Sequence, residues 1–176
     1  MDVLGIVYQF LDATLSPAPA AIVRGWQNRA ALPASSSVVI LTLLEAIRHG
    51  SNVHTRTTPQ NTTGLDDTLS MLTEYVVQVD FCGTDEETVA MQAAQLVAVG
   101  RDPVAVDFFK TYALRPLYAE DARALPFENE ARQWVTRYSV TMRLAGWTHI
   151  NRQIDAFDAV TITTENVDVH HPITDE

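Results

Sequence analysis

The spacing of apolar residues along the chain changes between a helical and an extended period. From residue 2 to residue 15, apolar side chains recur every three or four positions, which predicts an amphipathic helix. Residues 69–81 and 132–144 instead alternate between apolar and polar positions, which predicts two strands that each have one apolar face. Residues 37–47 are rich in β-branched side chains and apolar on both faces from 38 to 41, which predicts a strand either buried on both sides or placed between a helix layer and a neighbouring subunit.

Two further helices are indicated by the residues that would begin them. Thr84, with a glutamate three positions later, has the pattern of a capping box, and Gly100 is a plausible end for the helix that follows. Asp102 and Pro103 have the usual order of a cap and a first helical residue, so a second helix is expected to follow at once.

The order of these elements predicts the fold class. A helix, two strands, two helices and two strands follow one another, with the last strand expected at 157–169. Strands that cluster in adjacent pairs favour an antiparallel or mixed sheet over a doubly wound one. We therefore expect an α+β fold with a small mixed or antiparallel sheet and helices mainly on one face. It forms a single domain over 1–169, followed by a flexible tail at 170–176.

Residues 48–68 differ from their surroundings because they are polar and rich in threonine. Gly50, Pro59 and Gly64 interrupt the segment, which predicts a long loop or arm between two strands. Loops of this length inside compact domains are usually functional or disordered. Our hypothesis is an arm that orders on assembly, with His54, Arg56 and Pro59 as its contact residues.

The charge of the chain argues against one class of function. The 176 residues contain 22 Asp and Glu against 12 Lys and Arg, for a formal net charge of −10. Proteins that bind duplex DNA need a basic surface for the phosphates, so such a role is not expected. Eleven of the 12 basic residues are arginine, which indicates either fixed interface contacts or a compositional bias.

The single cysteine and the apolar runs give expectations about the compartment. Cys82 has no partner for an internal disulfide, which fits a reducing environment. Asp2 and the lack of a basic region near it make a secretory signal unexpected. Apolar runs fall short of the roughly 18 residues that cross a bilayer.

Catalytic and metal-binding patterns are weak. The glycines are scattered singly, and Cys82 is expected to be a buried small hydrophobe. Asp66–Asp67 and Glu86–Glu87 are possible acid pairs, although the second pair is explained by the start of a helix. The five histidines lack the tight spacing of zinc ligands. We expect no catalytic site, no cofactor and no metal.

Two polar segments, 23–33 and 115–134, combine arginine, amide and aromatic residues with proline. These residue types are enriched at the energetically important positions of protein interfaces, and proline lowers the entropy lost on ordering a loop. The alternative is that both segments are packed connections over the ends of the core. The candidate interface residues are Arg24, Trp26, Gln27, Asn28, Arg29, Arg115, Tyr118, Arg123 and Phe127.

The motifs in these segments resemble those of tailed-bacteriophage neck or tail-terminator proteins. "VRGWQNRAALP" is similar to an Arg-Gly-x-Gln-Asn-Arg signature followed by proline, and "VVILTLL" and "YVVQVDFCG" follow it. "RPLYAEDARALPFENEARQWVTRYSV" is similar to the family's Pro-Leu-Tyr, acidic pair, Leu-Pro-Phe and aromatic-Arg-aromatic strand. The resemblance covers roughly residues 1–165, with Trp26 bulkier than the family pattern and Glu128–Asn129 in place of an apolar residue and Asn.

The resemblance implies a structural protein of the virion rather than an enzyme. Such proteins form a ring, often a hexamer, that terminates the tail tube at the neck and joins the tail to the head-completion complex, with DNA passing through the lumen. The partners implied are copies of the chain, the tail tube protein and head-completion or connector proteins, assembled in the host cytoplasm. Two alternatives remain open: another neck component, such as an adaptor, and a small cytosolic enzyme whose Asp, His and Arg residues meet only in space.

Overall fold

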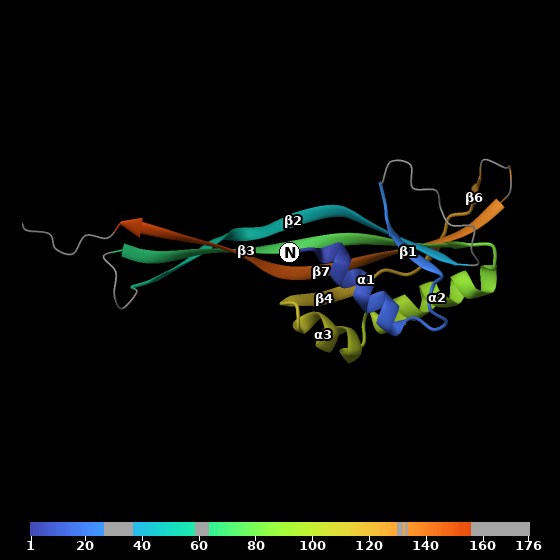
Figure 1. Cartoon of the computed structure of the whole chain (residues 1–176), viewed down its shortest axis with the longest axis horizontal. Coiled ribbons are helices and arrows are strands. Elements are labelled where there is room, and N and C mark those ends of the chain that lie inside the picture. Colours follow the sequence, from blue (N-terminus) through green and yellow to red (C-terminus); the bar gives the residue numbers. More distant parts are fainter. Residues whose placement is uncertain (27–36, 59–63, 130–131, 133, 156–176) are drawn as a thin grey trace, which may run out of the picture.

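The computed structural model of the chain describes residues 1–26, 37–58, 64–129, 132 and 134–155. These residues form three helices and seven strands around one hydrophobic core (Figure 1). Among them, no helix is long and apolar enough to cross a membrane. In chain order the elements are α1 (Val3–Thr14), β1 (Ala21–Arg24), β2 (Val38–Thr57), β3 (Gly64–Gly83), α2 (Glu86–Val99), α3 (Pro103–Lys110), β4 (Leu114–Ala119), β5 (Arg123–Ala124), β6 (Phe127–Glu128) and β7 (Trp134–Asp155).

The sheet is built around β3, which pairs on both sides along almost its whole length. The strand order is β1-β2-β3-β7-β4, and β5 and β6 pair with β7 beyond the end of β4. β3 is antiparallel to both β2 and β7, whereas β1 is parallel to β2. The sheet is therefore mixed, and the α+β fold class expected from the sequence is confirmed.

The helices cover one face of one half of the sheet (Figure 1). The covered face carries the apolar residues of three strands, which pair across the sheet in rows such as Leu41, Val79 and Val140. Phe10 of α1 and Phe109 of α3 are fully buried beneath this layer, with ring centroids 4.8 Å apart. Period-2 burial on the strands and three-to-four-residue burial on the helices place these side chains in one core.

Two of the three described helices, α1 and α3, begin with a side-chain cap. Asp2 accepts a hydrogen bond from the backbone of Gly5 at the start of α1, and Asp102 does the same for Val104 at the start of α3. For α2, the expected cap at Thr84 is wrong by one residue, because Asp85 is the N-cap. The Asp85 carboxylate is held by the Thr88 hydroxyl, which lowers the pKa of Asp85.

The polar segments hold more strand than the sequence pattern predicts. The expected irregular excursion at 48–68 is largely a β-ribbon, since β2 runs to residue 57 and β3 begins at residue 64. Residues 114–131, which precede the expected strand at 132–144 and show no strand pattern in the sequence, contain β4, β5 and β6, and β7 extends to residue 155 rather than 144. These strands are exposed on at least one side, so backbone pairing rather than an apolar pattern defines them.

Other expectations fall on residues outside the described ranges. These are the last strand at 157–169 and the tail at 170–176. The boundary of a single domain at residue 169 therefore stays a prediction.

The aromatic contact between α1 and α3 gives a test of the core. We expect Phe109→Ala to lower the free energy of unfolding by about 3–5 kcal/mol, because it removes a fully buried ring and leaves a cavity. Val106→Ala, on the exposed side of the same helix, is the matched control and should change stability little. Urea unfolding measures both, and equal losses in the two variants would contradict this core.

Candidate functional site

Three strands of the sheet continue beyond the helix layer as a ribbon, which we call the arm (Figure 1). The arm comprises residues 48–57 of β2, 64–73 of β3 and 147–155 of β7. Within the described part of the chain, both outer edges of the arm lack a pairing strand, because β1 pairs with β2 only through Leu41 and β4 pairs with β7 only as far as Gly146. Unpaired edges of this kind are templates for pairing with another strand.

A buried carboxylate lies within the arm. Asp67 of β3 is fully buried, and its Oδ2 lies 2.7 Å from Nε of Arg152 on β7. From β2, Nδ1 of His54 lies 3.2 Å away and Nε of Arg56 lies 3.6 Å away. The hydrogen bond from Arg152 is the main cause that lowers the pKa of Asp67, with a further contribution from His54. One negative charge therefore holds side chains from both neighbouring strands.

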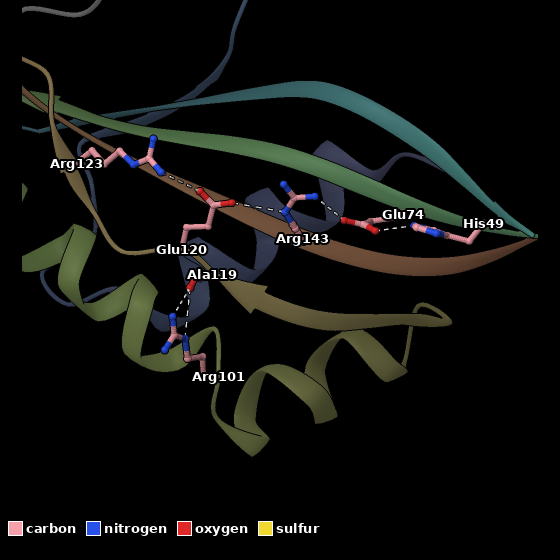
Figure 2. A network of polar contacts seen from close by, with 7 residues as sticks. All are labelled: His49, Glu74, Arg101, Ala119, Glu120, Arg123 and Arg143. Atoms are coloured by element: carbon pink, nitrogen blue, oxygen red, sulfur yellow. Dashed lines mark hydrogen bonds and ion pairs between the residues drawn. The ribbon is translucent and has the colours of Figure 1, made fainter.

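A second charged network crosses the sheet on the face that the helices leave open, which we call the open face. Figure 2 shows Arg123, Glu120, Arg143, Glu74 and His49 in a row. Glu74 accepts a hydrogen bond of 2.7 Å from Arg143 and lies 2.6 Å from Nε2 of His49. Glu120 lies 3.6 Å from both Arg143 and Arg123. The network thus connects β5, the end of β4, β7, β3 and β2 in one line in which basic side chains alternate with carboxylates.

The charges of this network reinforce one another. The hydrogen bond from Arg143 is the first cause that lowers the pKa of Glu74, and the hydrogen bond with His49 is the second. The same contact with Glu74 raises the pKa of Arg143. The Arg143 guanidinium also lies over the ring of Tyr118, 5.7 Å from its centroid, where a cation–π attraction adds to the ion pairs.

At the other end of the open face is a hollow of about 290 Å³. Trp26 and Phe127 are among its lining residues, together with Asp80 and Arg137, which form an ion pair of 2.8 Å. Asp80 is only 4% exposed, and neither its Oδ1 nor Nε of Arg137 has a hydrogen-bond partner in the described structure. The hollow therefore combines aromatic side chains with a charge-neutral polar pair.

Trp26 is presented to solvent by an unusual backbone. Its φ is +57°, a left-handed conformation that is costly for a bulky residue, and the side chain is 81% exposed. The preceding Gly25 donates a 2.7 Å hydrogen bond to the carbonyl of Leu41. A Cβ on Gly25 would lie 2.1 Å from Oγ1 of Thr42, so only glycine allows this close approach. The local geometry points the largest side chain of the segment outward.

Arg24, from the same segment, forms an ion pair with Asp2 of the same chain. Its Nη2 lies 2.5 Å from Oδ2 of Asp2, the N-cap residue of α1. The hydrogen bond from Arg24 is the first cause that lowers the pKa of Asp2. The contact ties the end of β1 to the first turn of α1.

The candidate residues from the sequence are thus distributed over several places. Trp26 and Phe127 meet at the hollow, whereas His54 and Arg56 meet at Asp67. Tyr118 and Arg123 join the open-face network. Arg115 is exposed near the start of β4, apart from these clusters. Gln27, Asn28, Arg29 and Pro59 lie outside the described residues.

The sequence analysis missed the central ion pairs, although a signal for them exists. Glu74 and Asp80 are six residues apart on β3, and Arg137 and Arg143 are six apart on β7. Equal spacing of opposite charges on the polar faces of two strands is the pattern expected of antiparallel neighbours. Each acid meets its arginine diagonally across the register.

Two features bear on catalytic chemistry. Burial raises the pKa of Cys82 to about 11, so this side chain stays a thiol near neutral pH and is a poor nucleophile. The expectation that Cys82 is buried is confirmed. Asp66 and Asp67, weighed as an acid pair, point to opposite faces of β3 because they are adjacent in a strand. Within the described ranges, no group of three or more His, Cys, Asp or Glu residues could hold a metal ion.

Asp67 gives a test of how the arm is held. We expect Asp67→Asn to speed amide hydrogen exchange in the arm, because a neutral amide cannot form ion pairs with Arg56 and Arg152 or accept the same contacts from His54. Asp66→Asn changes the same chemistry on the opposite face and should leave exchange in the arm near the wild-type rate. Mass-spectrometric exchange on peptides from β2 and β7 measures both variants. Equal protection of the arm in Asp67→Asn and wild type would show that the cluster is dispensable.

Glu74 gives a test with a defined pH dependence. Its pKa lies below the ordinary value of 4.5 in the folded protein, so the unfolded chain binds the proton more readily. The stability that Glu74 contributes is present above about pH 4.5 and is lost as pH falls through its lowered folded pKa. Glu74→Gln should therefore lose less stability on acidification than wild type, as measured by denaturant unfolding from pH 6 down to about pH 3. Parallel pH profiles would contradict this role.

The chain was compared with known protein families and solved structures. Residues 1–168 match the model of a family described as phage neck terminator protein. Among solved structures, the chain is similar to the sheath/tube terminator in the extended state of an extracellular contractile injection system, PVC, with 13% identity and a TM-score of 0.35. That match covers 99% of this chain and 66% of the other, so this chain spans just under two thirds of its length. No curated protein matches the chain.

Proposed function

We propose that this chain, which belongs to the phage neck terminator family, assembles into a ring that ends the tail tube and joins the tail to the head-completion complex. The family match over 168 of 176 residues is the observation that carries the proposal. Membership supports a structural, tail-terminating component of a phage, and a role other than that of an enzyme is part of the proposal. The ring, its hexameric state, its place at the neck and the passage of DNA through it are the proposed parts.

The distribution of surfaces supports a ring. Subunits of a closed ring meet through two different complementary surfaces. The arm lies at one end of the molecule, while β1 and β6, which border the hollow, lie at the other (Figure 1). The arm exposes Trp147 and Ile150, and the hollow has Trp26 on its lining. A molecule with distinct contact surfaces at its two ends fits a head-to-tail arrangement of copies.

The pairing of arginines supports a lumen that lets DNA pass. A protein that grips phosphates needs free basic groups. Most described arginines are instead paired with acids of the same chain, which neutralises them within the fold. They are Arg24, Arg56, Arg101, Arg123, Arg137, Arg143 and Arg152. With a net charge of −10, such a chain would line a channel without holding DNA in place.

The size of the assembly tests the ring. We expect the purified full-length chain, at rising concentration, to form one closed species with the mass of a hexamer in native mass spectrometry. Negative-stain images of that species should show a ring with a central opening. A compact monomer at every concentration, also in the presence of tail tubes, would contradict the ring. A dimer bound to a head protein alone would favour an adaptor role.

Exposed apolar residues of the arm test its part in assembly. Trp147 and Ile150 are 47% and 54% exposed on β7 of the arm. Replacing both with serine should weaken assembly about tenfold or more, because apolar anchors dominate interface energies, and should leave monomer unfolding nearly unchanged. The matched control replaces Val104 and Val106 on α3, which have similar exposure, with serine. Unchanged ring formation by the arm variant, measured by light scattering, would remove the arm from the contact.

A further inference from the structure

The outer edge of β2 is the longest free strand edge in the described structure. β1 pairs with β2 at residues 38–41, and the edge from Thr42 to Thr57 has no described neighbour. Free edges recruit further strands unless a protein protects them. This edge is irregular at two points, between Leu43 and Glu45 and between His49 and Val53, which leaves its outer part, 53–57, as the regular stretch.

The charge of this edge differs from that of the chain as a whole. Residues 46–57 contain Arg48, His49, His54 and Arg56 and no acidic residue, although the chain carries a net charge of −10. On the partner strand, Asp67 pairs with His54 and Arg56, and Glu74 pairs with His49, so within the described structure Arg48 is the basic residue of this stretch with no ion pair. A strand that pairs with the edge would therefore be favoured if it carried acidic side chains.

The chain itself contains a segment of this kind. Residues 157–169, FDAVTITTENVDV, are rich in β-branched side chains and predict a strand from their sequence. The segment contains Asp158, Glu165 and Asp168 and no basic residue. It lies outside the described residues and follows directly after β7, which ends at Asp155 at the outer end of the arm.

The distance between the two parts is short. Asp155 pairs with Gly64, and Thr57 pairs with Asp66, so the ends of β7 and β2 flank the same end of β3. A strand outside β2 would lie three strand spacings from β7, about 14 Å. About five extended residues cover this distance, so the chain after Asp155 reaches the edge of β2 by about residue 161.

The direction of the chain also fits. β2 and β7 both run toward the outer end of the arm, since each is antiparallel to β3. A segment that returns from Asp155 would run antiparallel to β2. The spatial order of the four strands would be that of a Greek key, although β3 and β7 are joined through α2, α3, β4, β5 and β6 rather than by a hairpin.

We propose that residues 161–169 pair with the outer edge of β2 in the same chain and form a fourth strand of the arm. The acidic segment covers the edge of β2, which carries basic and no acidic residues over 46–57, and the β7 edge at 147–155 is left as the open edge of the arm. An arm with one open edge pairs with a further strand on one side only, which favours a defined contact between molecules over open-ended stacking.

Cysteine pairs test the pairing directly. Thr55→Cys places a thiol on the outer part of β2, and single cysteines at each of positions 160–165 are combined with it in turn. Cys82 is buried and its pKa is raised to about 11, so the native thiol does not compete under mild oxidation. Neighbouring strands bring Cβ atoms within disulfide range, so one or two of the double variants should form a bond within the monomer. Non-reducing gels and peptide mass mapping report the bond.

A matched acceptor on the other edge separates the alternatives. Gln153→Cys lies on β7 near the same end of the arm and is combined with the same six positions. Bonds to position 153 in place of position 55 would show that the segment folds back on β7 and would overturn the proposal. Bonds only between chains, seen as dimers, would overturn pairing within one chain, as would the lack of bonds at both acceptors.

Hydrogen exchange supplies a second readout that needs no added thiol. Stopping the chain after Asp155 should remove protection from amides of β2 between residues 51 and 57, while the core strands keep theirs. Equal exchange in the shortened and full-length chains would count against the fourth strand. Both results are obtained on the monomer, so they stand or fall separately from the proposed ring.

Discussion

The sheet of this protein is longer than the helix layer that covers it, and this mismatch is the constraint on which the rest of the structure depends. β3 has 20 residues, but the buried apolar positions that pack under the helices lie between residues 76 and 82. Beyond them the strands have no helix against either face (Figure 1). Backbone pairing and side-chain contacts between neighbouring strands have to hold the arm in place of a hydrophobic core.

Buried charge fills part of that role. A buried carboxylate is costly unless it is paired and hydrogen-bonded, and Asp67 meets that requirement with side chains from both neighbouring strands. On the open face, Glu74 and Asp80 make the corresponding contacts to Arg143 and Arg137 nearer the core. Asp67 and Glu74 therefore join the strands on both sides of β3, and Asp80 joins β3 to β7. The same pairs engage arginines within the chain, so the contacts that hold the sheet also support the proposed lumen that does not hold DNA.

How much of this could be predicted from the sequence depends on where the apolar residues are. The strand at 69–81 was predictable because its one buried face leaves a period of two in the sequence. The helices after Asp85 and Asp102 were predictable because helix starts have a characteristic local sequence. The outer parts of β2 and β3 were not, because both of their faces are polar and pairing across the sheet is not visible in a single strand. Trp26 and Phe127 were singled out for their residue types and both line the hollow. Asp67 was considered as half of a catalytic acid pair, whereas in the structure it forms ion pairs between strands. Its role depends on Arg152, 85 positions away, and on the register that joins them.

The proposed terminator has two ends that serve different contacts. The position of the chain on the tail is the most direct test of this proposal. Full-length chain carrying a small electron-dense label would be added to isolated tail tubes that lack it, and the label would be located by electron microscopy. The account predicts labels at one end of each tube, together with tubes that stop growing when more tube protein is supplied. Labels along the sides of the tubes, or tubes that keep growing beyond the label, would contradict it.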